Sequence, residues 1–102
     1  MGRIRTLMEM KDILKKHEKE LKKGYRIKKI GIFGSYLRAE AKEDSDLDIL
    51  VEFVRDTEIG LLKFVELENY LSDLLGVEVD LVEKSALKLR IGKHILKEVE
   101  YL

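Results

Sequence analysis

Three short apolar segments with the spacing of β-strands alternate with amphipathic segments, and this order constrains the fold more than any other feature. Residues 27–33 form a run rich in β-branched side chains, and in residues 47–53 apolar side chains occupy every second position. Residues 77–82 repeat that period of two, which is typical of a strand with one apolar face. Strands that alternate with helices in a chain of 102 residues predict one small sheet covered by helices.

Apolar residues three and four apart predict the helices. They cover residues 3–23, 61–75 and the stretch from Ser85 onward, and a brief helix follows the Gly34-Ser35 break through about residue 41. Gly24 and Gly76 would end the first and the third of these four helices, because glycine readily adopts the left-handed backbone of a helix end. The predicted order is αβαβαβα, an α/β (α+β) fold with a mixed sheet of three or four strands. At this length we expect a single domain over residues 1–102.

His17 falls on the apolar stripe of the first predicted helix. A partly buried histidine without a metal is the favoured interpretation, because no second metal-binding pattern lies near it in the sequence.

Charge is balanced overall but unevenly distributed. The chain has 20 basic and 20 acidic side chains, which argues against a protein that coats nucleic acid by bulk electrostatics. Residues 1–29 hold 11 basic and 4 acidic side chains, whereas residues 40–83 hold 3 basic and 14 acidic ones. This asymmetry predicts a cation site in the acidic middle or oppositely charged partners, with plain surface decoration as the alternative.

The chain contains 0 cysteines, which excludes disulfides, zinc–thiolate clusters and thiol nucleophiles. No stretch approaches the roughly 18 to 20 apolar residues of a membrane span. We therefore expect a cytoplasmic protein that does not enter the membrane.

Asp46 and Asp48 stand two residues apart at the start of the second predicted strand. Alternation along a strand places both carboxylates on one face, with Cα atoms roughly 6.5 Å apart. Two carboxylates this close repel each other, and Mg²⁺ held together with substrate phosphates removes the repulsion. The structural alternative is that Asp46 caps a turn beside Ser45 while Asp48 faces solvent on an edge strand.

Gly34-Ser35 ends the first predicted strand, with ten residues between Ser35 and Asp46. At a junction of strand and helix, glycine lets the backbone approach a ligand, free N–H groups favour phosphate, and the serine hydroxyl adds a donor. Arg38, one helical turn later, would place a guanidinium on the same phosphates or would simply face solvent.

Asp80 supplies a third carboxylate, on the polar face of the third predicted strand. If that strand lies beside the strand of Asp46, three carboxylates converge, enough for two metal ions. One ion would hold a triphosphate and the other would activate a hydroxyl. A strand aspartate paired with a surface lysine is the structural alternative.

Taken together, these motifs resemble the nucleotidyltransferase signature of the DNA polymerase beta superfamily. They are Gly34-Ser35, Asp46-Leu47-Asp48 followed by Ile49-Leu50-Val51, and Asp80. In length and in the sequence around these motifs, the chain is most similar to the minimal nucleotidyltransferases, which serve as antitoxins beside HEPN-domain toxins. The resemblance covers about residues 27–102 and implies a polymerase beta-like fold. One departure is Ala39, where many relatives have glycine after the arginine, and it leaves the local loop path open.

The resemblance also implies an activity. In that family the Gly-Ser turn holds the nucleoside triphosphate, the aspartate pair binds Mg²⁺, and the third aspartate completes the metal site and helps to deprotonate the acceptor. By position these roles fall on Gly34, Ser35, Asp46, Asp48 and Asp80. The implied reaction is attack by a tyrosine hydroxyl of a partner HEPN toxin on the α-phosphate of ATP, with pyrophosphate leaving. The added AMP would block the toxin's RNase activity.

A non-catalytic antitoxin that masks the toxin active site is the alternative, with the basic terminal helices carrying the function. Transfer to a small antibiotic-like acceptor is disfavoured because such enzymes add a helical domain. We expect no stable direct binding to nucleic acid. We expect exposed apolar positions on the terminal helices, such as Met8, Ile95 and Leu102, and these favour a homodimer or a hetero-oligomer with the toxin.

Overall fold

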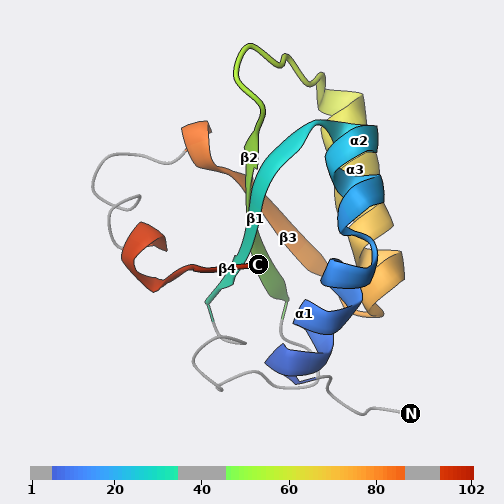
Figure 1. The fold of residues 1–102 in the computed structure, drawn as a ribbon, viewed down its shortest axis with the longest axis vertical. Helices are drawn as coiled ribbons and strands as arrows, with labels where there is room; N and C mark the ends of the chain where they lie inside the picture. Colours follow the sequence, from blue (N-terminus) through green and yellow to red (C-terminus); the bar gives the residue numbers. More distant parts are fainter. Residues whose placement is uncertain (1–5, 35–45, 87–94) are drawn as a thin grey trace.

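Hydrogen bonds join four strands into one mixed sheet in the computed structural model, which describes residues 6–34, 46–86 and 95–102 (Figure 1). The strands are β1 (Ile27–Phe33), β2 (Leu47–Phe53), β3 (Val79–Glu83) and β4 (Glu100–Tyr101), in the spatial order β3-β2-β1-β4. β1 pairs antiparallel with both β2 and β4, whereas β2 and β3 run parallel. The mixed sheet covered by helices that the sequence predicts is confirmed.

β2 is a central strand, and its burial follows from that place. Ile49, Leu50 and Val51 are all fully buried, so both faces of this strand are covered at its middle. The alternative that placed Asp48 on an edge strand is therefore wrong. Three helices lie along one side of the sheet (Figure 1), and Met10, Leu14 and leucines of the later helices pack there against the sheet.

The first predicted helix is two helices, α1 (Leu7–Lys16) and α2 (Glu18–Tyr25). α1 begins with a capping box in which Thr6 and Glu9 satisfy each other's backbone N–H groups. His17 lies between the helices, half-buried, with Nδ1 3.0 Å from the carbonyl oxygen of Ile13. The interpretation of His17 as a partly buried histidine fits this contact, but the single helix was wrong.

The predicted end of that helix at Gly24 is also wrong, because α2 continues to Tyr25 and the left-handed residue is Arg26, with φ of 55°. Tyr25 then lies against Tyr70 of the third helix, with ring centroids 6.1 Å apart. Burial and a hydrogen bond to Glu66 raise the pKa of the Tyr25 hydroxyl, so the phenol stays protonated in this contact.

α3 (Leu61–Leu75) ends where the sequence predicts, because Gly76 adopts φ of 73°. Only some of its apolar residues face the core. Leu67, Leu71 and Leu75 are fully buried, whereas Leu61 and Leu62 are exposed by 78% and 87%. The helix therefore contacts the core mainly through its middle and end, and Phe64 of its first turn is partly buried against the core.

The closing helix is only partly as expected. Residues 84–86 form a 3₁₀ turn that includes Ser85, and residues 95–98 form a helical turn, but residues 100–101 form β4 instead of helix. Ile95 and Leu102 are half-buried rather than exposed, while Met8 is exposed as expected. β3 also begins two residues later than predicted, and the predicted helices over residues 35–41 and 87–94 lie outside the described residues. No helix in the described ranges is long and apolar enough to span a bilayer.

Candidate active site

The sheet brings two of the predicted carboxylates together. Asp48 and Asp80 are register partners on the parallel strands β2 and β3, and neighbouring strands lie about 4.8 Å apart. Asp48 is half-buried and Asp80 is exposed. The two strands are therefore adjacent, as the sequence reasoning assumed, and both side chains lie on the same face of the sheet.

Asp46 precedes β2 by one residue and is exposed. The amide of Leu47 donates to the carbonyl oxygen of Glu78 at 2.8 Å, so the ladder continues just ahead of both strands. By the alternation of strand residues, Asp46 shares the face of Asp48. Glu78 precedes Asp80 by two residues and falls on the same alternation, a carboxylate that the sequence reasoning did not single out.

Gly34 closes the site on the β1 side. It follows β1 directly, and its neighbour Phe33 is the register partner of Asp48. Gly34 has φ of 81°, and a Cβ placed on it would run into the Asp48 carboxylate, reaching 3.0 Å from Cγ. Backbone conformation and space both require glycine here. The turn thus lies directly against one of the two paired carboxylates.

A second acidic side chain contacts this turn, from the side opposite Asp48. The amide of Gly34 donates to Oε1 of Glu98 at 2.8 Å. Glu98 belongs to the helical turn over residues 95–98 and is half-buried. Sequence reasoning missed it, because the two residues are separated by 64 positions and no motif marks Glu98.

The remaining predicted phosphate contacts, Ser35 and Arg38, lie outside the described residues. Their roles stay predictions.

The oxygen donors of Asp48 and Asp80 suit Mg²⁺, which prefers carboxylate oxygens and keeps part of its shell for water or phosphate. Within residues 6–34, 46–86 and 95–102, no three metal-binding side chains stand close enough together to hold an ion. Asp46, Asp48 and Asp80 are all among these residues, so the close convergence of three carboxylates that the sequence predicts is not found, and their binding of metal stays a prediction.

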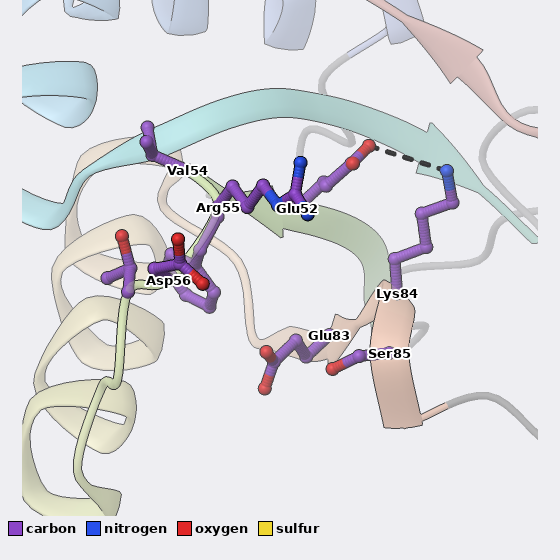
Figure 2. Close-up of a pocket in the computed structure, with 9 residues that line it drawn as sticks. Glu52, Val54, Arg55, Asp56, Glu83, Lys84 and Ser85 are labelled. Carbon is purple, nitrogen blue, oxygen red and sulfur yellow. Dashed lines mark hydrogen bonds and ion pairs between the residues drawn. The ribbon is translucent and has the colours of Figure 1, made fainter.

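An open pocket of about 470 Å³ lies at the other end of β2 (Figure 2). It is lined by residues 52–57 and 83–85, and Lys84 lies 3.4 Å from the carboxylate of Glu52. Glu52 and Phe53 end β2, whereas Asp48 lies near its start, so this pocket contains none of the predicted site residues.

Comparison with known proteins assigns the chain to a family. A profile described as nucleotidyltransferase domain matches residues 14–102. The chain belongs to this family. The resemblance inferred from Gly34, the aspartate pair and Asp80 is thereby confirmed.

Individual relatives give a more detailed comparison for this nucleotidyltransferase. It is 57% identical to protein adenylyltransferase MntA of Thermococcus cleftensis over 97 residues, 95% of this chain and 96% of that protein. A solved structure called a minimal nucleotidyltransferase matches with a TM-score of 0.73 and 34% identity, covering 96% of this chain and 100% of that one. A chain of the toxin–antitoxin complex MntA–HpeT matches with a TM-score of 0.66 and 25% identity, covering 86% and 68%. The predicted polymerase beta-like nucleotidyltransferase fold is confirmed by these likenesses.

Proposed function

We propose that this nucleotidyltransferase is an antitoxin that transfers AMP from ATP to a tyrosine hydroxyl of a partner HEPN-domain toxin and so inactivates it. The observation that carries the proposal is the Asp48–Asp80 pair directly beside the glycine turn of Gly34. Support comes from the 57% identity to a protein adenylyltransferase and from the structural likeness to a toxin–antitoxin chain. The absence of cysteine favours a reducing cytoplasm as the location of the protein. In this proposal the functional form is a hetero-oligomer of the antitoxin with its toxin.

In the proposed reaction the tyrosine oxygen attacks the α-phosphorus of ATP, the bond to the β-phosphate oxygen breaks, and pyrophosphate leaves. Gly34 allows the backbone to approach the triphosphate, with Ser35 and Arg38 as the proposed further contacts. Asp46 and Asp48 would hold Mg²⁺ with the nucleotide, which supplies charge neutralisation at the phosphates. Asp80, exposed beside Asp48, is the group we propose to receive the proton of the attacking hydroxyl.

The proposal predicts that Asp48→Asn abolishes transfer of label from α-labelled ATP to the co-purified toxin in the presence of Mg²⁺. Removing one electrostatic group of a catalytic site costs about 10²-fold or more in rate. Asp46→Asn is expected to behave alike. The matched control is Asp73→Asn, the same change at an exposed carboxylate on α3, which should leave the rate within about twofold of wild type.

Protection of cells separates catalysis from binding. The Asp46→Asn/Asp48→Asn double variant should fail to neutralise a co-expressed toxin, although it still binds the toxin. If cells with this variant survive as well as cells with the wild type, masking of the toxin is the function and the transfer proposal is wrong.

A further inference from the structure

Gly34, which directly follows β1, lies between two carboxylate side chains. One comes from β2, and the other comes from the helical turn that precedes β4. Asp48 of β2 fills the space where a side chain at Gly34 would lie. Glu98 accepts the Gly34 N–H at 2.8 Å from the side of β4. The family motif includes the first of these carboxylates but not the second.

The β1–β4 ladder explains why Glu98 reaches this amide. Ile32 is the register partner of Glu100, so two residues further along this antiparallel pair Gly34 lies opposite Glu98. At that point the chain is already helical, because the amide of Val99 donates to the carbonyl oxygen of Ile95 at 2.8 Å. The carboxylate of Glu98 therefore supplies the acceptor that an extended main chain would otherwise provide.

Backbone contacts of the residues that follow Glu98 attach this segment to the sheet. The amide of Leu102 donates to the carbonyl oxygen of Ile30 at 3.1 Å, and Gly31 pairs with Tyr101. Glu98 is thus attached to the sheet at its C-terminal side and touches the glycine turn with its side chain. A carboxylate that accepts a backbone N–H makes a charge-assisted hydrogen bond, which is stronger than a neutral one.

We propose that Glu98 is a positioning residue that fixes the Gly34 turn in the conformation that receives the triphosphate. Glycine has access to many backbone conformations, so a turn built on it needs an external contact to remain in one of them. When only a fraction of molecules has the competent turn, the apparent dissociation constant rises by the inverse of that fraction. The inference rests on the proposed nucleotide-transfer function, and it assigns the Gly34 N–H to Glu98 rather than to phosphate.

The test measures binding of Mg·ATP to the full chain by calorimetry, and transfer to the toxin at varied ATP. Glu98→Ala is expected to raise the dissociation constant and the KM for ATP about tenfold, as for a turn competent in about a tenth of molecules. The kcat at saturating ATP should stay within about twofold. Glu98→Gln keeps an oxygen acceptor and should restore binding to within about threefold of wild type.

Glu100→Ala is the matched control. Glu100 lies two residues further along the same segment, and its carboxylate pairs with Lys11, an exposed contact that contributes little to stability. This variant should bind Mg·ATP as the wild type does. A purely structural role of Glu98 would lower the melting temperature without separating KM from kcat.

Amide exchange of Gly34 tests the contact without any nucleotide. The Gly34 N–H should exchange faster in Glu98→Ala than in Glu100→Ala. If Glu98→Ala binds Mg·ATP as tightly as the wild type, the inference is wrong. Tighter binding also overturns it, because it would mean that the nucleotide has to displace the carboxylate from the Gly34 N–H. If the wild type binds no Mg·ATP, the proposed function is wrong. The positioning role is tested separately: it is wrong if the Gly34 amide exchanges at the same rate in Glu98→Ala and Glu100→Ala.

Discussion

At the scale of single residues, Gly34 shows how conformation and packing require the same residue. Its φ of 81° lies in the region where side chains are strained, and the space a Cβ would need is taken by Asp48. Gly24 makes the opposite comparison, because a Cβ there would meet nothing within 4 Å and the residue lies inside α2. One glycine is required by its surroundings and the other is tolerated.

Gly34→Ala should therefore destabilise the chain by about 1–2 kcal/mol through backbone strain alone, and displace the Asp48 carboxylate as well. Gly24→Ala should instead stabilise it by about 0.5–1 kcal/mol, because alanine favours a helix interior. Urea unfolding gives both values, and Mg·ATP calorimetry shows whether binding is lost only in the first variant. Equal stability of the two variants would contradict the packing argument.

The residues that sequence reasoning finds at this scale are those whose chemistry is local. Gly34 ends an apolar run, and Asp46 and Asp48 share a face by simple alternation, so their neighbourhood follows from short-range rules. Asp80 needed the added assumption that its strand lies beside theirs, which the register confirms. Glu98 could not be found this way, because its contact depends on where β4 pairs.

At the scale of elements, strands were predicted better than helix faces. β1 and β2 have the predicted bounds because clear breaks follow them in the sequence: Gly34 follows β1, and the alternation of apolar residues along β2 stops before Arg55. In α3 the apolar residues surround most of the helix, so sequence periodicity gave no unique buried face. Tertiary packing selected the Leu67, Leu71 and Leu75 stripe and left Leu62 exposed.

Leu71→Ala should cost about 2–5 kcal/mol, because a fully buried leucine leaves a cavity on truncation. Leu62→Ala, the same change on the same helix, should stay within about 0.5 kcal/mol of wild type, since this side chain is 87% exposed. Chemical unfolding of both variants compares the two faces of α3 directly. A large loss in Leu62→Ala would show that the exposed face is covered in solution.

At the scale of the whole molecule, the sheet is completed by a contact between its first strand and a segment far along the chain. β4 is only two residues long, and the apolar spacing that precedes it is typical of a helix, so no local pattern indicates a strand there. Gly31 permits the pairing. A Cβ at Gly31 would lie 2.7 Å from a methyl carbon of Val99 and 3.0 Å from the carbonyl oxygen of Glu100.

Gly31→Ala should weaken the attachment of β4 to β1 and cost about 1–3 kcal/mol, the range for overpacking a close contact. Faster exchange of the Leu102 amide, which donates to Ile30, would locate the damage at β4. Gly24→Ala again serves as the control, with unchanged exchange at Leu102. Normal protection of this amide in Gly31→Ala would mean that the strands separate enough to admit a methyl group without releasing β4.

The separation of 64 positions between Gly34 and Glu98 also sets an order in time during protein synthesis. A chain that has grown as far as β3 already carries the glycine turn and every aspartate of the proposed site. It still lacks the segment that holds the turn, and contacts between distant segments form only after both have been made. We therefore expect nascent chains that stop before residue 98 to bind Mg·ATP more weakly than chains that include Glu98, although both contain the aspartates of the proposed site.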